Sequence, residues 1–271
     1  MTTGRNRVQD ANPPATPPPS IARHVDLSGL RAIVTGASRG IGASMASCLD
    51  AAGANVVLVA RRGDLLADVA STFTNDHQCV VADLSELDGL PTVIQQVHER
   101  WGGTDILVNN AGITAPQPAE RVTPQSWQNV LDVNLTSVFA LAQLVAPGMK
   151  ANGFGRIINV ASVLGVLGEA WAAPYCATKA GVIGLTRSLA TEWSSHGITV
   201  NALSPGWVHT DMVDDFAQDP RFNKRVISRT PARRWGQPTD LDGPLLLLAS
   251  RQSSFLTGHN LVVDGGLSTS W

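Results

Sequence analysis

Short apolar runs alternate with amphipathic stretches along most of this chain. The first run, residues 32–35, leads into a glycine-rich turn, and a helical pattern then continues from Ile41 to about Ala52 and stops at Gly53. The runs that predict strands are residues 32–35, 55–60, 78–82, 106–109, 156–160, 199–203 and 260–263. Runs that are apolar at nearly every position are typical of strands buried on both faces of a sheet.

Helical periodicity fills the stretches between the predicted strands. The further helices are expected at residues 65–73, 87–101, 123–152, 172–196 and 238–249. Pro147 is expected to kink or shorten the end of the helix over 123–152, because proline cannot donate a helix hydrogen bond. Residues 207–236 show no clear period, and we interpret them as an inserted lid.

The alternation of strands and helices predicts one α/β domain over residues 25–271. We expect a doubly wound Rossmann domain with a seven-stranded parallel sheet and helices on both faces, because parallel strands need right-handed crossovers. Residues 1–24 are polar and rich in proline, so we interpret them as a flexible or extended tail. A targeting peptide is the alternative, and the tail could also lie against a neighbouring subunit.

Composition narrows the class of protein. The 271 residues include 20 basic and 22 acidic residues, which gives no reason to expect binding to nucleic acid or to a membrane surface. Cys48, Cys79 and Cys176 show no metal-ligand spacing, so we expect reduced thiols of a cytoplasmic protein and no metal site. No apolar run reaches the roughly 20 residues that a membrane span needs.

The turn after the first predicted strand is suited to a dinucleotide. Gly36 can take the tight turn, Gly40 lets the backbone approach a ligand, and Gly42 lets the new helix pack closely on the strand. A helix N-terminus with free N–H groups favours a pyrophosphate. A tight turn without a ligand is the alternative. The cofactor contacts expected here are Gly36, Ser38, Arg39, Gly40, Ile41 and Gly42.

The end of the second predicted strand indicates which cofactor the chain prefers. A free ribose 2′-hydroxyl would need a carboxylate here, but Ala60 is followed by Arg61 and Arg62. Arg39 in the glycine turn can point to the same place. Two guanidinium groups suit a 2′-phosphate, so the sequence favours NADP(H) over NAD(H). The alternative is that Arg61 and Arg62 are solvated residues at a helix start.

Two further strand ends carry candidate cofactor contacts. Asp83, which precedes Leu84, can accept from an adenine amino group or cap the helix that begins near Ser85. The next strand ends in small residues, which let a cofactor lie across the sheet edge; they are Asn109, Asn110, Ala111 and Gly112. Asn109 can instead tie neighbouring strands together.

Tyr175, the only tyrosine in the chain, is the candidate acid/base. Lys179 follows four residues later in the predicted helix, so both side chains lie on one helix face. The pKa of a free tyrosine is about 10, and a fixed ammonium group nearby favours the phenolate. Ser162 ends the fifth predicted strand at the edge where such folds bind ligands, and its hydroxyl can hold a substrate carbonyl oxygen.

At these positions the chain resembles the short-chain dehydrogenase/reductase family, over about residues 27–267. The resemblance implies that Tyr175 is the general acid/base, that Lys179 lowers its pKa and binds the nicotinamide ribose, and that Ser162 orients the substrate. The matching motifs are residues 35–42, Asn109-Asn110-Ala111-Gly112, Asn134, Ser162, Tyr175 with Lys179, residues 205–210 and Asp264-Gly265-Gly266.

The resemblance also assigns residues that periodicity alone does not. Asn134 is similar to a helix asparagine that holds a water in a proton relay to the lysine. Arg39 and the dipeptide Ala60-Arg61 resemble those of NADP-preferring members. A homotetramer paired through helices 123–150 and 175–196 is expected, because family members are commonly tetramers. The residues similar to those that contact the nicotinamide and its carboxamide are Pro205, Gly206, Val208 and Thr210.

Together these residues predict an NADP(H)-dependent oxidoreductase that transfers a hydride between nicotinamide and a carbonyl or secondary alcohol. The expected substrate pocket contains Leu164, Trp171, Trp207 and the stretch 211–230. Segments 219–222 and 229–236 resemble gluconate 5-dehydrogenase-type members, and the general pattern also fits 3-oxoacyl-carrier-protein reductases. A sugar acid or polyol therefore ranks level with a small keto compound or an oxoacyl substrate.

Two other classes of protein are alternatives. An NADP(H)-binding sensor with this fold would be expected to lack the Tyr–Lys pair or Ser162, and this chain has all three. A sugar-nucleotide epimerase or dehydratase would need a larger C-terminal substrate region, but only about 60 residues follow Pro205.

Overall fold

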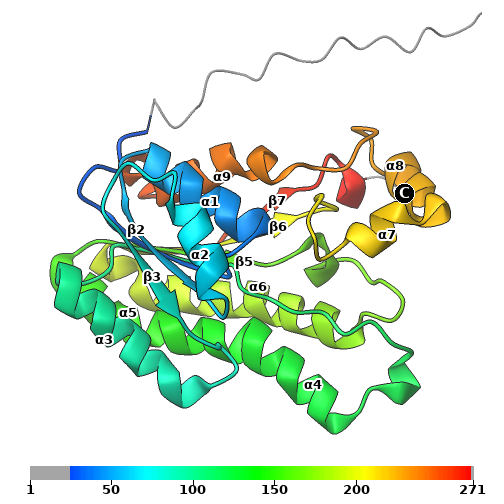
Figure 1. Cartoon of the computed structure of the whole chain (residues 1–271), viewed down its shortest axis with the longest axis horizontal. Helices are drawn as coiled ribbons and strands as arrows, with labels where there is room; N and C mark the ends of the chain where they lie inside the picture. The colour runs from blue at the N-terminus through cyan, green and yellow to red at the C-terminus, as the bar shows by residue number, and fades with distance from the viewer. Residues whose placement is uncertain (1–24, 270–271) are drawn as a thin grey trace, which may run out of the picture.

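Seven parallel strands form one sheet in the order β3-β2-β1-β4-β5-β6-β7 (Figure 1). The computed structural model describes residues 25–269, so the tail predicted over residues 1–24 lies outside the described residues. The strand order reverses between β1 and β4, which confirms the predicted doubly wound sheet. The strands are β1 (Arg31–Thr35), β2 (Asn55–Ala60), β3 (His77–Val81), β4 (Ile106–Asn109), β5 (Gly155–Val160), β6 (Ile198–Pro205) and β7 (Asn260–Val263).

Helices cover both faces of this sheet (Figure 1). Alternate residues of β1 enter different layers, with Val34 in one and Ile33 in the other, which explains why the strand sequences are apolar throughout. The helices on one face are α1 (Gly40–Ala51), α2 (Gly63–Ala70) and α9 (Asp242–Ala249). The helices on the other face are α3 (Leu90–Trp101), α5 (Ser137–Asn152) and α6 (Ala173–Trp193).

The predicted helix over residues 123–152 is three consecutive segments. Thr123 caps α4 (Pro124–Leu131) by accepting from Ser126 N at 3.1 Å. A π-helical turn, Asp132–Thr136, then leads into α5. Helix α5 continues through Pro147 to Asn152, so the expected shortening at Pro147 is wrong. Pro147 is exposed, and its missing N–H removes one helix hydrogen bond without ending the helix.

The segment Pro124–Asn152 corrects one expectation about membranes. It is 29 residues long and apolar enough to cross a bilayer by length and composition, whereas no such stretch was expected from the sequence. Half of its most apolar window is buried inside the fold. Leu141, Val145 and Met149 of α5 pack in the core against the sheet, so this is a half-buried core helix.

The segment over residues 207–236, called the lid after its expected role, contains regular structure that the sequence analysis missed. It includes α7 (Asp214–Gln218) and α8 (Pro220–Arg229). Asp219 accepts from Arg221 N at 3.0 Å, and Pro220 occupies the first turn of α8. This Asp-Pro pair is an ordinary helix-start signal, and it was available in the sequence.

Candidate active site

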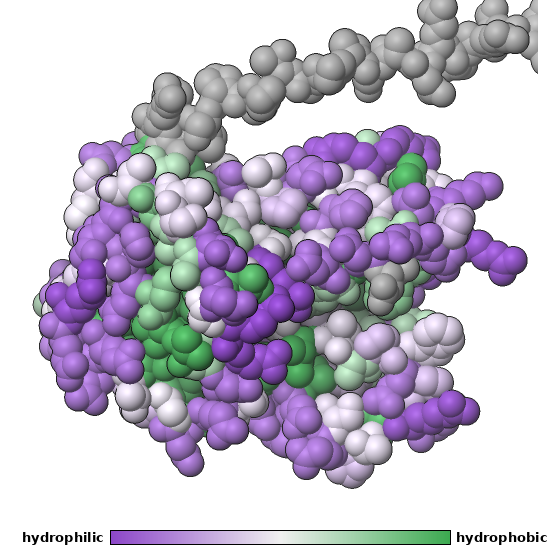
Figure 2. All heavy atoms as spheres, viewed as in Figure 1, coloured by the Kyte–Doolittle hydropathy of each residue, from purple (hydrophilic) through white to green (hydrophobic). Residues whose placement is uncertain are grey.

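A cavity of about 1060 Å³ opens at the carboxyl edge of the sheet, bounded by the ends of β1, β2, β4, β5 and β6 and by the lid. Figure 2 shows the surface hollowed between the lid helices above and α4 below, on the right of the view. Nearly every site residue predicted from the sequence lines this cavity. Gly42 and Asn134 do not, and both lie just behind its wall.

The glycine turn adopts the backbone that was expected. Gly36 and Gly40 have φ values of +65° and +55°, in the left-handed region that favours glycine. A side chain at Gly42 would collide with the carbonyl oxygen of Gly36. Gly42 therefore allows α1 to pack closely on the turn.

The start of α1 fits a negatively charged group. Helix α1 begins at Gly40, and the side chain of Arg39 makes no hydrogen bond to the first turn. Ser38, Gly40 and Ile41 line the cavity at this point. The free N–H groups and the helix dipole of such a turn favour a pyrophosphate, so these residues fit a dinucleotide.

Asn110 lines the cavity at the end of β4. Its Nδ2 donates to the carbonyl oxygen of Thr35 at 2.9 Å, and its backbone N donates to Thr35 Oγ1 at 3.0 Å. These bonds join the end of β4 to the end of β1. Asn109 instead donates to Asn159 Oδ1 at 2.9 Å and ties β4 to β5, the structural role that the sequence allowed.

Arginines gather at the end of the cavity beside β2. Arg39, Arg61 and Arg62 all line it. Arg39 Nη1 lies 3.4 Å from Asp211 Oδ2, and Arg61 Nη1 lies 3.7 Å from Asp83 Oδ2. Each of the two arginines expected at a 2′-phosphate therefore has a nearby carboxylate, and their side chains are more than half exposed.

Asp83 forms a turn with Ser85 and does not cap a helix, since the next helical segment begins at Leu87. Its Oδ1 accepts from Ser85 N at 2.9 Å and from Ser85 Oγ at 2.7 Å. These hydrogen bonds, with the nearby Arg61, hold the pKa of this carboxyl below its usual range. Asp83 and Leu84 also line the cavity, so a contact with adenine stays a prediction.

Ser162 follows β5 and presents its hydroxyl to the cavity. Its Oγ accepts from Leu164 N at 3.1 Å, so the hydroxyl proton remains available to a partner in the cavity. The side chain also hydrogen-bonds with Tyr175. The backbone of a short turn, Val163–Gly165, thus orients the serine toward the tyrosine.

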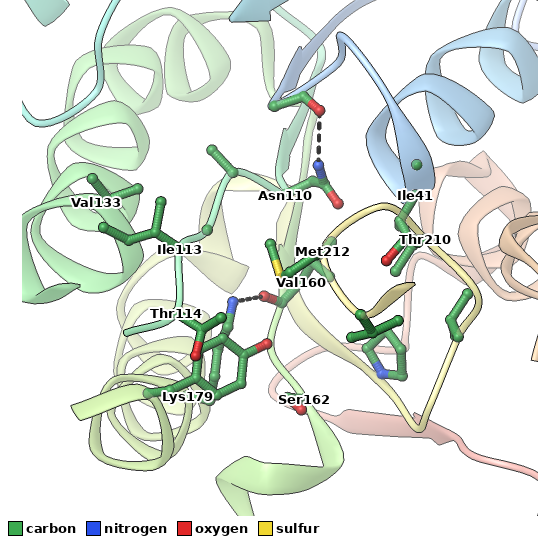
Figure 3. Close-up of a pocket in the computed structure, with 18 of the residues that line it drawn as sticks. Ile41, Asn110, Ile113, Thr114, Val133, Val160, Ser162, Lys179, Thr210 and Met212 are labelled. Carbon is green, nitrogen blue, oxygen red and sulfur yellow. Dashed lines mark hydrogen bonds between the residues drawn. The ribbon is translucent and has the colours of Figure 1, made fainter. Parts of the chain in front are cut away.

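Lys179 reaches across from α6 to the same strand. Its Nζ donates to the carbonyl oxygen of Val160 at 2.7 Å, as the dashed line in Figure 3 shows. The lysine is 3% exposed, and Nζ lies 5.6 Å from the centre of the Tyr175 ring. An ammonium group has three donors, so two remain for other partners in the cavity.

Burial dominates the proton affinities of this pair. It raises the pKa of Tyr175 above its ordinary value, and the hydrogen bond with Ser162 opposes this rise. Burial also lowers the pKa of Lys179 to about 8. Desolvation penalises both charged forms, and the lowering of the Tyr175 pKa by Lys179 stays a prediction. The tyrosine is held as a neutral phenol, ready to donate a proton.

Asn134 lies fully buried in the π-helical turn behind the cavity. Its Oδ1 accepts from Ile113 N at 2.8 Å, and its Nδ2 donates to Ile113 O at 2.9 Å and to Thr178 Oγ1 at 3.3 Å. Asn134 thus joins the segment after β4 to the helix that carries the Tyr–Lys pair. Its role in a proton relay stays a prediction.

The loop after β6 closes over the start of α1. Pro205, Gly206, Val208 and Thr210 line the cavity. A side chain at Gly40 would meet Thr210 Cγ2 at 3.2 Å, so this loop and the glycine turn approach closely. Figure 3 shows Thr210 and Ile41 at one side of the cavity and Lys179 at the other.

The predicted substrate residues have different surroundings. Leu164, Trp171 and Trp207 all line the cavity. Trp171 is 63% exposed and has a φ of +63°, which is rare for a side chain of this size. The ring of Trp207 packs edge-on against Phe222 at 5.0 Å and Trp235 at 5.9 Å, so it also belongs to the lid's own aromatic cluster.

Sequence reasoning did not single out several residues of this cavity. Ile113 and Val133 come from the segment after β4 and from the π-helical turn, and Met212 comes from the lid (Figure 3). Glu169 also lines the cavity and was passed over, whereas Met212 and Arg225 lie in the stretch 211–230 that was expected in the pocket only as a whole. A signal for Arg225 existed, because a helix begun at Asp219-Pro220 puts it one turn from Phe222.

Known proteins share this arrangement over nearly the whole chain. The family model described as Enoyl-(Acyl carrier protein) reductase matches residues 36–268. Gluconate 5-dehydrogenase of Gluconobacter oxydans is 40% identical over 247 residues, which cover 90% of this chain and 96% of the relative. The 3-oxoacyl-acyl-carrier-protein reductase FabG of Vibrio cholerae is 37% identical over 243 residues, which cover 90% of this chain and 99% of the relative.

A solved structure gives the same result. The crystal structure of a gluconate 5-dehydrogenase from Burkholderia cenocepacia, in complex with NADP and tartrate, has a TM-score of 0.86 at 40% identity and covers 91% of this chain and 98% of that one. The fold, the clustered Ser162, Tyr175 and Lys179, and these relatives agree. The chain belongs to the short-chain dehydrogenase/reductase family and is an NAD(P)-dependent oxidoreductase acting on CH–OH groups.

Proposed function

We propose that this protein is an NADP(H)-dependent dehydrogenase of a sugar acid or a related polyol, acting on a secondary alcohol or the corresponding ketone. The observation that carries the proposal is the meeting of two groups of residues in one cavity. Ser162, Tyr175 and Lys179 line it beside the end of β5, and Arg39 and Arg61 line it near the ends of β1 and β2.

The chain's own residues move and hold the proton. In reduction, the Tyr175 phenol donates its proton to the substrate oxygen, while the Ser162 hydroxyl holds that oxygen. Lys179, anchored on Val160, keeps a positive charge beside the forming phenolate and has donors left for ribose hydroxyls. The cofactor, when bound, supplies or accepts the hydride.

Preference for NADP(H) rests on charge at the adenosine end of the cavity. Strand β2 ends at Ala60 and is followed by two arginines, without the carboxylate that would accept from a free 2′-hydroxyl. Arg39 and Arg61 have exposed guanidinium groups that can bind a 2′-phosphate. The relative from Burkholderia cenocepacia was solved with NADP, which supports the same choice.

The substrate class rests on the relatives as well as on the cavity. Gluconate 5-dehydrogenase of Gluconobacter oxydans and 2-dehydro-3-deoxy-D-gluconate 5-dehydrogenase of Escherichia coli are 40% and 37% identical to this chain. The second candidate is a 3-oxoacyl-acyl-carrier-protein reductase, favoured by the 37% identity to FabG. A non-catalytic NADP(H) sensor is the remaining alternative.

Assembly and location are part of the proposal. We expect a homotetramer in the cytoplasm. Trp127 of α4 and Phe139 of α5 are 39% and 41% exposed, and burial of such side chains between subunits would be favourable. Cys48, Cys79 and Cys176 are free thiols, which fits a reducing compartment.

A substrate panel tests the proposal. NADPH and NADH oxidation would be followed with keto-gluconates, neutral keto-polyols and a 3-oxoacyl thioester, and NADP⁺ reduction with gluconate. Turnover of the sugar-derived compounds with NADPH preferred is the expected result. Preference for the thioester would support the second candidate, and silence across the panel would support the sensor.

A further inference from the structure

We infer that Arg225 of the lid is the residue that binds the carboxylate of an acidic substrate, and that Glu169 positions it. The inference deepens the proposed function and rests on it. Arg225 lies in α8, and Glu169 lies in the loop between Ser162 and α6. Both line the cavity that holds Ser162, Tyr175 and Lys179.

The Glu169–Arg225 pair joins two segments that are distant in sequence. Arg225 Nη2 donates to Glu169 Oε2 at 3.0 Å. Glu169 is the more buried partner, with 18% of its side chain exposed against 42% for Arg225. The Glu169 carboxylate is therefore part of the cavity wall, and the Arg225 guanidinium contacts it from α8 of the lid.

A ring supports the guanidinium from a second direction. The Arg225 Cζ lies over the Phe222 ring, 4.5 Å from its centre. Phe222 packs edge-on against Trp207, and Trp235 beside them is 7% exposed and donates to Asn223 Oδ1 at 2.8 Å. Arg225 thus stands on a packed aromatic cluster, so part of the entropy cost of fixing a long side chain is already met before a ligand binds.

The arginine keeps binding capacity for a ligand. A guanidinium has five N–H donors on two edges, and Glu169 occupies one nitrogen. A second carboxylate can approach the other edge in bidentate geometry. Because both side chains line the cavity and Arg225 is 42% exposed, a ligand can reach that edge without breaking the bond to Glu169.

The charged lid side chains that line the cavity make Arg225 the group suited to bind an anion. Among the lid side chains that the structure describes, the charged ones lining the cavity are Asp211, Asp219 and Arg225. Asp211 lies against Arg39, and Asp219 caps α8. Arg39 and Arg61 belong to the β1–β2 side of the sheet, across β4 and β5 from β6, which leads into the lid. Arg225 is therefore the cation that the described lid offers to a substrate.

The test compares an acid with its neutral amide. D-gluconate and D-gluconamide have the same hydroxyl groups and nearly the same shape, and they differ in charge. NADP⁺-loaded wild-type protein should bind gluconate more tightly in calorimetry. Arg225→Met should weaken gluconate binding and raise its KM by roughly ten- to a hundredfold, the usual weight of a charge-assisted hydrogen bond, while the values for gluconamide stay nearly constant.

Three further variants distinguish binding of the substrate from an ion pair that only holds the lid to the cavity wall. Arg225→Lys should recover part of the preference for the acid. Glu169→Gln keeps an acceptor for Arg225 but removes a negative charge, so gluconate should bind more tightly. Arg221→Met is the matched control, because Arg221 lies on the same helix outside the cavity lining. Circular dichroism and melting temperature establish that each variant is folded.

The outcomes are distinguishable. Equal affinity of the wild type for the acid and the amide would overturn the inference. An Arg225→Met variant that loses affinity for both compounds equally would also overturn it, because an ion pair with a purely structural role has that effect. Failure of the proposed function looks different: calorimetry would show acid binding at Arg225, but no sugar-derived compound would be turned over.

Discussion

The ammonium group of Lys179 is fixed on the carbonyl oxygen of Val160 at 2.7 Å, at the end of the strand that leads to Ser162. One β-strand end thus holds the lysine and precedes the serine, while α6 carries both the lysine and Tyr175. The three groups owe their geometry to a single strand–helix unit. The pKa values of Tyr175 and Lys179 should therefore depend on how deeply this unit is buried.

Carbonyl reduction should lose efficiency in mildly alkaline solution. Burial lowers the pKa of Lys179 to about 8, so its ammonium is present below that pH and is lost above it. The pKa of Tyr175 is raised, so its phenol keeps its proton throughout. We expect kcat/KM for NADPH-dependent reduction to fall as pH rises through about 8. A rate that stays constant well above this pH would contradict the assignment.

Tyr175→Phe should remove catalysis and spare cofactor binding. The variant loses the proton donor but keeps the ring that packs beside Lys179. General acid catalysis is worth about 10²- to 10⁴-fold, so kcat should fall by that order. NADPH fluorescence titration should give a nearly unchanged Kd. A fully active phenylalanine variant would show that another group donates the proton.

Asp211→Asn should tighten NADPH binding. Asp211 lies 3.4 Å from Arg39 and competes with a 2′-phosphate for its guanidinium. An exposed ion pair of this kind is worth at most about 1 kcal/mol, so the gain in affinity should not exceed about fivefold. Asp214→Asn is the control, since Asp214 pairs with His209. If the affinity for NADH rises by the same factor, Arg39 does not bind the 2′-phosphate, because NADH lacks that group.

Gly42→Ala should destabilise the fold by several kcal/mol, because the new methyl group would overlap the Gly36 carbonyl oxygen and push α1 off the turn. Gly148→Ala in α5 is the opposite case. Nothing lies within 4 Å of a side chain there, so alanine should stabilise the helix by about 0.5–1 kcal/mol. Chemical denaturation measures both, and similar effects in the two variants would contradict the packing argument.

Strands and most helices could be predicted because their signals are local. The predicted bounds of β2, β4 and β7 match the structure residue for residue, since apolar runs end where the chain leaves the sheet. The lid helix α8 was missed because it is mostly polar and buries only Val226, so no apolar period marks it, although Asp219-Pro220 signals its start. The π-helical turn was missed because a turn of this kind leaves no mark in the spacing of apolar residues.

The site was predictable where its residues share one element or one sheet edge. Tyr175 and Lys179 are one turn apart, and Ser162 follows a strand, so the topology alone brings them together. The Glu169–Arg225 pair joins residues that are 56 positions apart through the packing of the lid. The raised pKa of Tyr175 likewise depends on how deeply the packed chain covers it.

The base of the lid has a consequence for how this protein can change. The lid begins and ends at the contact of Val208 with Gly236, where Gly236 N donates to Trp207 O and His209 N donates to Gly236 O. Because both ends meet, the residues between them form a closed insertion whose length and sequence can vary at little cost to the sheet. New substrate specificities can evolve through changes in the lid, while the proton donor Tyr175 lies on α6, outside the segment that changes.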